Sequence, residues 1–324
     1  MHHLHIHGTV IVFLAHGTKM HTSGIKVSFI IVDYNTFVPL QKLIDTIREK
    51  TKDVGYEIIV VDNSGDTKTP FFQKNYPDIN YISNSKNLGF SKAANIGIRH
   101  STGRYVLLLN PDTRLKNNVA MLLCRFLDQH PDVGIVGSKI LNDDESIQFS
   151  CRSFPSYKAA FFNRYSLLTR IVPGNRYSTA YINPLNSHNK TAEVDWLSGS
   201  CMMLRKQALE VVGLFDENFF MYCEDVDICR RMKLLGWKVV YYPEAILYHS
   251  IGRSSSQNKI KTVIERHKSM WTYHKKYFNR NKAIDIIIWF GIGSRCISHL
   301  IIALVQHYSV KYFSFQLHRN LHFI

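Results

Sequence analysis

Apolar and polar positions alternate in blocks along the first part of the chain. Residues 27–32 are apolar except for Ser28 and rich in β-branched side chains, which is typical of a strand buried on both faces. The segment 38–50 then carries apolar residues at helical spacing, at Leu40, Leu43, Ile44 and Ile47. This pattern predicts a buried strand followed by an amphipathic helix.

The same alternation continues to residue 113. A second buried-type strand runs into a turn within 56–66. The segment 79–113 contains in order a short strand, a loop with glycine, a helix from about 91 to 99 and a strongly apolar strand at 105–109. This order is typical of an open, mostly parallel sheet flanked by helices, so the predicted fold class is α/β.

The middle of the chain has a weaker pattern. Residues 117–131 have a helical pattern, and residues 237–243 predict a strand that a second apolar segment at 245–250 follows. Residues 154–192 are rich in Pro, Asn and Ser and show no sustained period. We therefore expect loops there, some of them mobile.

The segment 225–236 predicts a further helix. Ile228, Met232 and Leu235 fall on one face, and Gly236 supplies the expected stop. The residues at its start are acidic: Glu224, Asp225 and Asp227. The helix dipole favours negative charge in a first turn by only about 0.3 to 1 kcal/mol, which explains one acid better than three.

Two interpretations of this acidic cluster remain open. In the first, the acids only decorate the start of a helix. In the second, Asp225 or Glu224 is a general base that takes a proton from an attacking hydroxyl. The aromatic residues Phe220 and Tyr222 just before the cluster would then form a wall of the site.

Polar residues follow three of the predicted strands. They are Asp33, Tyr34 and Asn35, then Asp62 and Asn63, then Asn110 and Asp112. In open parallel sheets ligands bind beyond the carboxyl ends of the strands. We therefore expect these residues to meet at one binding rim.

Several of these side chains have a possible chemical role beside a plainer one. Asp62 can accept the imide N–H of a pyrimidine base, or it can cap its own turn. Tyr34 can stack on a base or pack in the core. Asp112, held by the stiff Pro111, can coordinate Mg²⁺ or Mn²⁺ on a diphosphate, although a turn alone has the same pattern. His249, at the end of an apolar segment, can ligate a metal, although most lone histidines do not.

The charge balance indicates an anionic partner. Forty Lys and Arg against 25 Asp and Glu give a formal charge of +15, which suits nucleic acid, a phospholipid surface or a phosphorylated small molecule. The basic residues are spread widely and are densest near the carboxyl end, so we expect no nucleic-acid partner. The six cysteines lack C-x-x-C spacing, which predicts reduced thiols in a cytosolic setting.

The two ends of the chain differ from the rest. Residues 1–24 are histidine-rich, and their apolar run at 10–15 is too short for a signal peptide. We therefore interpret them as a leader or tag-like segment and expect it to be disordered, with Met20 as an alternative start. Residues 266–282 are basic and aromatic, and residues 283–305 are apolar but interrupted by Asp285, Arg295 and His299. A central arginine costs about 2.5 to 3.5 kcal/mol in a spanning helix. We therefore expect a helix that lies on or dips into an anionic membrane face, with a buried helical hairpin as the alternative.

Six sequence blocks, in order, resemble the family-2 glycosyltransferases with the GT-A fold, and most closely the bacterial rhamnosyltransferases of surface polysaccharide synthesis. The blocks are VSFIIVDYNT, IIVVDNSGD, NLGFSKAANIGI, YVLLLNPDT, VDWLSGSCMMLRK and GLFDENFFMYCEDVDICRRMKLLGWKVVYYPEAILYHS. The resemblance implies a catalytic domain at 25–256, with a nucleotide-sugar-binding half at 25–115 and an acceptor-binding half at 116–256. A helical extension at 257–324 follows.

The resemblance also implies roles for individual residues. Those toward the donor nucleotide and its metal are Tyr34, Asp62, Asn87, Gly89, Asn110, Asp112 and His249. Those where donor sugar and acceptor meet are Trp196, Gly199 and Ser200, with Asp225 as catalytic base and Glu224 beside it. The usual D-x-D of the family is here Asn110, Pro111 and Asp112, so metal binding would depend mainly on Asp112 and His249.

The activity implied is a single inverting displacement with Mn²⁺ or Mg²⁺ as cofactor. The expected donor is dTDP-rhamnose, with UDP-galactofuranose, GDP-mannose or a UDP-hexose as alternatives. The expected acceptor is a polyprenyl-diphosphate-linked glycan at the cytoplasmic face of a bacterial membrane. A silent sugar-nucleotide binder and a basic nucleic-acid-binding protein are the alternatives from other functional classes.

Overall fold

A computed structural model describes residues 24, 26–65, 68–156, 185, 188–250, 259–278 and 281–321, with side chains up to residue 305. The predicted leader, apart from Gly24, and most of the predicted loop region at 154–192 lie outside these residues. All six cysteines fall within the described part and are free thiols, as the sequence predicts.

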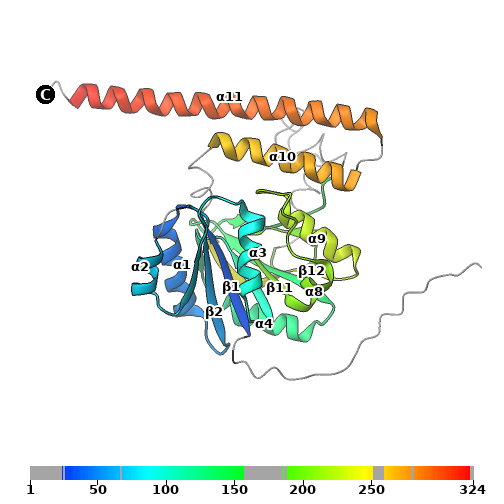
Figure 1. Ribbon diagram of the computed structural model, residues 1–324. Helices are drawn as coiled ribbons and strands as arrows, with labels where there is room; N and C mark the ends of the chain where they lie inside the picture. Colours follow the sequence, from blue (N-terminus) through cyan, green and yellow to red (C-terminus); the bar gives the residue numbers. More distant parts are fainter. Residues whose placement is uncertain are drawn as a thin grey trace, which may run out of the picture.

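A mixed, mostly parallel sheet forms the centre of the molecule (Figure 1). Its main path has the order β3-β2-β1-β4-β11-β6-β12-β5. These strands are β1 (Val27–Asp33), β2 (Tyr56–Asp62), β3 (Ile79–Ser83), β4 (Tyr105–Leu109), β5 (Thr113–Leu115), β6 (Val133–Leu141), β11 (Cys201–Arg205) and β12 (Lys238–His249). Neighbouring strands pair in parallel except where β11 and β5 are involved.

Short strands extend this framework. They are β7 (Ile147–Gln148), which pairs with β6, β9 (Ala192–Glu193), which pairs with β12, and the separate pair β8 (Cys151–Arg152) and β10 (Trp196–Leu197). One sheet therefore runs through both halves of the predicted catalytic domain.

Helices cover both faces of the sheet. Before the carboxyl-terminal pair they are α1 (Phe37–Lys50), α2 (Thr69–Asn75), α3 (Phe90–His100), α4 (Val119–Gln129), α8 (Lys206–Val212) and α9 (Glu224–Leu234). The core beneath α1 and α4 takes Phe29 and Ile31 from β1, and the core beneath α3 and α9 takes Ile30. The central strand is thus buried on both faces, as its mostly apolar run predicts.

Two predictions of local structure need correction. Leu235, expected on the buried face of the acidic helix, is 54% exposed because α9 ends at Leu234. The strand predicted at 237–243 and the apolar segment at 245–250 form one strand, since β12 continues to His249 with a register shift between Tyr242 and Ile246. A β-bulge accommodates Pro243, which cannot donate to the ladder. The short helix α2 and strands β5 and β7 to β10 have no clear signal in the sequence.

Two helices form the carboxyl-terminal extension. α10 (Lys259–Phe278) lies between the catalytic domain and α11 (Lys282–Leu321), which runs along its outer side (Figure 1). The segment Lys282–Val305 is long and apolar enough to cross a membrane by length and composition, with a mean hydropathy of 1.7 over its apolar window, yet only 6% of that window is buried. It is therefore no part of the buried core, which removes the alternative of a buried hairpin.

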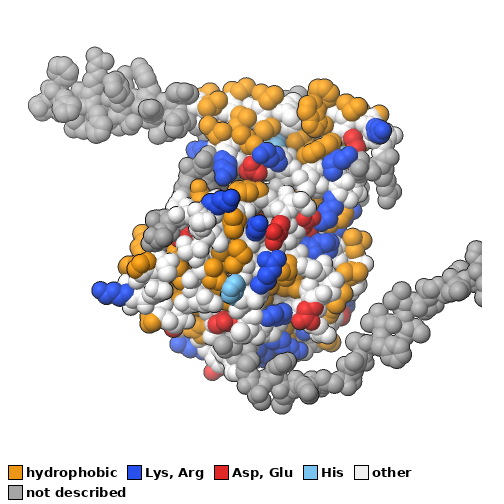
Figure 2. Space-filling view, in the orientation of Figure 1, with side chains coloured by type: hydrophobic (Ala, Val, Ile, Leu, Met, Phe, Trp, Pro, Cys, Tyr) orange, Lys and Arg blue, Asp and Glu red, His pale blue; other side chains and the backbone are white. Residues whose placement is uncertain are grey.

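Polar and apolar side chains of α11 point in different directions. His274 Nε2 of α10 lies 2.7 Å from Asp285 Oδ1, and the rings of His267 and His299 are 5.3 Å apart. Hydrophobic side chains gather on the outer surface over these helices (Figure 2). The exposed apolar residues of α11 are Ile284, Ile286, Ile287, Trp289, Phe290, Ile297, Ile301, Ile302, Leu304 and Val305.

Candidate active site

A cavity of about 370 Å³ lies at the carboxyl ends of β1 and β4, where it meets the start of α3, the first turn of α9 and one face of α10. The predicted site residues that line it are Tyr34, Asn87, Gly89, Asn110, Asp112, Gly199, Ser200, Glu224, Asp225 and His249. Segments more than 200 residues apart in sequence therefore share one space. Of the predicted site residues, only Asp62 and Trp196 do not line it.

The strand ends meet as the predicted sheet requires. β1 lies between β2 and β4, and Asp33 pairs in register with Asp62 at the rim. Tyr34 and Asn63, the residues just beyond these two, line the cavity. The rim therefore supplies one aromatic ring and one amide on the side where β1 and β2 end.

Asp62 lies behind this wall rather than in it. It is fully buried, its Oδ1 accepts from the Ser64 amide at 2.9 Å, and its Oδ2 accepts from the Tyr81 hydroxyl at 2.7 Å. The first bond is the local turn contact that the plainer interpretation of this aspartate predicts. A direct contact between Asp62 and a base stays a prediction. The Asp62 carboxylate would have to accept the base N–H in addition to the two hydrogen bonds that it already accepts.

The loop before α3 is held against the loop before α9. Asn63 Nδ2 donates to Asn87 Oδ1 at 3.0 Å and to the Gly89 carbonyl at 3.1 Å. Gly89 has a φ of +88°, and a Cβ there would lie 2.6 Å from the carbonyl oxygen of Phe220. Only glycine fits such a contact, so this position joins the loop before α3 to the aromatic wall.

Asp112 and His249 come together from β4 and β12. His249 Nε2 lies 3.3 Å from Asp112 Oδ1 and 3.4 Å from Asn110 Nδ2. His249 Nδ1 lies 2.6 Å from Gln148 Oε1, an oxygen that can only accept, so Nδ1 carries the ring proton. With the proton on Nδ1, a neutral ring would direct its Nε2 lone pair toward the Asp112 carboxylate.

Two electron-pair donors that face each other fit a divalent cation. Carboxylate oxygen and neutral imidazole nitrogen are ordinary ligands of Mn²⁺, and an oriented second nitrogen is typical of metal-bound histidine. Asn110 contributes an amide in place of the family's first aspartate. Within the described residues, no cluster of three or more His, Cys, Asp or Glu side chains is arranged to hold a metal, so the remaining ligands would come from water or substrate.

Asp225 faces the cavity from the first turn of α9. Its Oδ2 accepts from the Gly199 amide at 3.1 Å and its Oδ1 from the Val226 amide at 2.9 Å. Burial raises the pKa of this carboxyl above its ordinary value, although the two amide hydrogen bonds oppose that shift. A half-buried carboxylate with a raised pKa is a stronger base than an exposed one.

Glu224 is more deeply buried beside it. Burial, followed by the charge of Asp225, raises the pKa of Glu224 well above its ordinary value. Its Oε2 is buried and has no hydrogen-bond partner among the described residues. Glu224 therefore keeps its proton more readily than Asp225, which leaves Asp225 as the ionised member of the pair.

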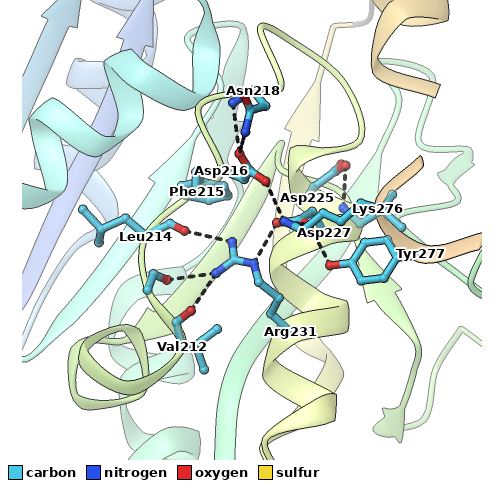
Figure 3. A network of polar contacts seen from close by, with 12 residues as sticks. Val212, Leu214, Phe215, Asp216, Asn218, Asp225, Asp227, Arg231, Lys276 and Tyr277 are labelled. Atoms are coloured by element: carbon cyan, nitrogen blue, oxygen red, sulfur yellow. Dashed lines mark hydrogen bonds and ion pairs between the residues drawn. The ribbon is translucent and has the colours of Figure 1, made fainter. Parts of the chain in front are cut away.

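Asp227, the third acid, does not line the cavity and points toward Arg231, Lys276 and Tyr277 (Figure 3). It is fully buried, with Oδ2 2.8 Å from Arg231 Nε and Oδ1 2.7 Å from both Lys276 Nζ and Tyr277 Oη. Arg231 also donates to the carbonyls of Val212 and Leu214, each at 2.8 Å. This network ties α9 to α10.

The strand that precedes Gly199, β10, is buried in the protein core. Trp196 is 9% exposed, and its indole N–H donates to the Ser153 carbonyl at 2.9 Å. Ser200 Oγ accepts from Asn110 Nδ2 at 3.3 Å, and the Ser200 carbonyl accepts from the Asn110 amide at 3.1 Å. Trp196 thus belongs to the hydrophobic core rather than to the cavity lining. Gly199 and Ser200 connect Asp225 with the end of β4.

Sequence reasoning missed one wall of the cavity. Lys261, Thr262, Glu265 and Arg266 of α10 line it, together with Phe220, Met221 and Tyr222 of the loop before α9. The aromatic wall was expected, but the basic part of α10 was interpreted only as a membrane-contacting segment. A spacing of one, four and five residues on a helix could have indicated a shared face.

Comparisons with known proteins agree with this geometry. A family model described as Glycosyl transferase family 2 matches residues 28–213. The N-acetylglucosaminyl-diphospho-decaprenol L-rhamnosyltransferase of Mycobacterium tuberculosis is 29% identical over 228 residues, which are 67% of this chain and 73% of that protein. Rhamnosyltransferase WbbL of Escherichia coli is 27% identical over 244 residues, which are 72% of this chain and 85% of that protein.

A solved structure shows the same fold. The mannosyltransferase PcManGT from Pyrobaculum calidifontis, in complex with GDP-Man and Mn²⁺, aligns with a TM-score of 0.52 and 16% identity over 91% of this chain and 81% of that one. The expected GT-A fold is thus confirmed. The family match covers more than half of the chain, although it ends before Asp225 and His249. The chain is a glycosyltransferase and belongs to glycosyl transferase family 2.

Proposed function

We propose that this enzyme transfers L-rhamnose from dTDP-rhamnose, with inversion, to a hydroxyl of a polyprenyl-diphosphate-linked glycan. One observation carries the proposal: Asp225, a candidate base, and the pair of Asp112 and His249, a candidate cation site, line the same cavity. The names of the bacterial relatives support the rhamnosyl donor and, for the mycobacterial one, the diphospho-polyprenol acceptor.

The proposed chemistry begins at Asp225. Its carboxylate removes the proton of the acceptor hydroxyl, the hydroxyl oxygen forms a bond to the anomeric carbon, and the bond from that carbon to the diphosphate oxygen breaks. The electron pair of the broken bond leaves with the nucleoside diphosphate. Attack on the face opposite the leaving group inverts the anomeric centre without a covalent enzyme intermediate.

The donor is held by the rim of the sheet in this proposal. Tyr34 offers a ring face to the pyrimidine base, and the loop with Asn87 and Gly89 shapes the space beside it. Asp112 and His249 would hold Mn²⁺ or Mg²⁺, which when bound neutralises charge on the departing diphosphate. The presence of Mn²⁺ in the PcManGT complex supports the same choice of cofactor.

We further propose that the enzyme docks on the cytoplasmic face of the membrane through α11. The apolar side chains of this helix are exposed, while Asp285 and His299 face α10. A spanning α11 would bring the adjacent α10, with lysines such as Lys268, into hydrocarbon, which is unfavourable. A helix in the plane of an anionic surface keeps α10 in water and gains about 1 kcal/mol per nearby basic residue.

A donor screen tests the proposal. Purified enzyme is supplied with Mn²⁺ or Mg²⁺, a polyprenyl-linked acceptor mixture and one donor at a time from dTDP-rhamnose, UDP-galactofuranose, GDP-mannose and a UDP-hexose. Transfer with dTDP-rhamnose is expected. Transfer only with one of the other donors would replace the proposed sugar, and the absence of transfer with any donor would favour a silent sugar-nucleotide binder.

A further inference from the structure

The first helix of the carboxyl-terminal extension belongs to the cavity as well as to the membrane-facing pair. Lys261, Thr262, Glu265 and Arg266 line the cavity from one face of α10. Elsewhere on the same helix, His267 and His274 contact α11. α10 is thus the layer that separates the reaction space from the exposed apolar side of α11 (Figure 1).

Two cations of this face are held over the aromatic wall. Lys261 Nζ lies 4.8 Å from the ring centroid of Phe220, and the Arg266 guanidinium lies 4.6 Å from that of Tyr222. Arg266 Nη2 is also 3.3 Å from the Tyr222 hydroxyl. Since Tyr222 precedes Glu224 by two residues, both cations lie along the wall that leads to Asp225.

The helix is fixed in this position by its own contacts. Ser269 Oγ donates to the Met221 carbonyl at 2.8 Å, and Lys276 and Tyr277 bind Asp227. The loop 220–222 and α9 therefore hold α10 at two points. Lys261 and Arg266 therefore lie on a helix that is anchored to the catalytic domain.

We propose that Lys261 and Arg266 bind the diphosphate of the lipid-linked acceptor, so that α10 forms the acceptor subsite. This inference rests on the proposed function for the identity of the acceptor. A guanidinium fork and an ammonium point charge are the groups that recognise diphosphate oxygens. The donor diphosphate has a separate candidate partner in the cation site of Asp112 and His249.

The position of the lipid supports the acceptor over the donor. The diphosphate of a polyprenyl carrier lies at the membrane surface, and α10 is the part of the cavity wall that packs against α11. In an acceptor with one sugar, the attacking hydroxyl is one ring away from the diphosphate. Cations on the wall that leads to the Asp225 carboxylate suit that separation.

The test compares two acceptors in detergent micelles, which remove the need for membrane docking. One acceptor carries the sugar on a polyprenyl diphosphate, and the other carries it on a neutral alkyl chain. For Lys261→Ala and Arg266→Ala we expect a KM for the diphosphate acceptor raised about tenfold or more, with the KM of the donor and the use of the neutral acceptor unchanged. Arg266→Lys should recover part of the loss, because it keeps the charge and loses the fork.

Lys259→Ala is the matched control. It removes the same charge from the same helix at an exposed position that does not line the cavity. We expect the control to have the wild-type KM for both acceptors. A raised donor KM in Lys261→Ala or Arg266→Ala would assign the two cations to the donor diphosphate, and an equal loss with both acceptors would show a structural role; either result overturns the inference.

Direct binding separates this inference from the proposed function. The affinity for a short-chain polyprenyl diphosphate, measured by calorimetry in detergent, requires neither the correct donor nor turnover. We expect about tenfold weaker binding in both alanine variants and no change in Lys259→Ala. Unchanged binding in the alanine variants would refute the acceptor subsite even if rhamnosyl transfer is observed, and the failure of every donor would leave the binding result intact.

Discussion

Asp225 and Asp227 lie two positions apart on the first turn of α9 and have opposite environments. Asp225 faces the cavity, accepts only backbone N–H groups among its described hydrogen bonds, and has a raised pKa. Asp227 is fully buried against Arg231, Lys276 and Tyr277. The helix turns by about 100° per residue, so side chains two positions apart point to different neighbours.

This difference separates chemistry from stability within one short stretch. A carboxylate that accepts hydrogen bonds only from backbone N–H groups can exchange a proton with a substrate, whereas a carboxylate in a buried ion-pair network holds two helices together. The acidic cluster therefore contains one candidate base, one more deeply buried neighbour with a raised pKa, and one structural anchor. The four predictions that follow test this division.

The largest expected effect is on turnover in Asp225→Asn. The amide cannot take the proton of the acceptor hydroxyl, so we expect kcat to fall about 100- to 10,000-fold. The dissociation constant of the donor, measured by calorimetry, and the Tm should stay close to the wild type. Wild-type turnover in this variant would show that the base is elsewhere.

Asp227→Ala should instead reduce stability. It leaves Arg231 and Lys276 without their shared buried carboxylate, and the loss of one partner of a buried pair costs about 3 to 5 kcal/mol. The free energy of unfolding in urea measures the loss. A stability equal to that of Asp225→Asn would contradict the division between the two acids.

The pH profile sharpens the assignment of the base. Asp225 must be ionised to act, and burial raises its pKa, so kcat/KM should fall as the pH drops through a value above the ordinary 3.8 of an aspartate. Below that value the rate should decrease about tenfold per pH unit. The residual activity of Asp225→Asn should lack this fall of kcat/KM at low pH. If the variant shows the same fall with the same midpoint, the titration belongs to another group.

The smallest effect is expected for Tyr277→Phe. This change removes one hydrogen bond to Asp227 and keeps the ring and the ion pairs, so the loss of stability should be about 1 kcal/mol. Its kcat at saturating substrates should equal that of the wild type. A loss as large as that of Asp227→Ala would mean that the tyrosine, rather than the two cations, anchors α10.

The repeating pattern of the chain determined the catalytic fold. Unbroken β-branched runs predict strands that are buried on both faces, and Leu40, Leu43, Ile44 and Ile47 are all buried as their spacing requires. Because parallel strands place their carboxyl ends at one edge, the rim with Tyr34 and Asp112 also follows from the sequence. Strands of two or three residues, such as β5 and β7, are too short to leave a periodic signal.

Only the tertiary structure decided which polar side chains share a space. Asp62 lies at the end of a strand, and Asp112 lies just beyond the end of another. The oxygens of Asp62 nevertheless accept hydrogen bonds from Ser64 and Tyr81 behind the cavity wall. α10 brings Lys261 and Arg266 to Asp225, although its sequence indicates only a basic helix near an apolar one. The physical reason is that periodicity reports which face of an element is apolar, whereas the neighbour of its polar face depends on packing between segments far apart in the chain.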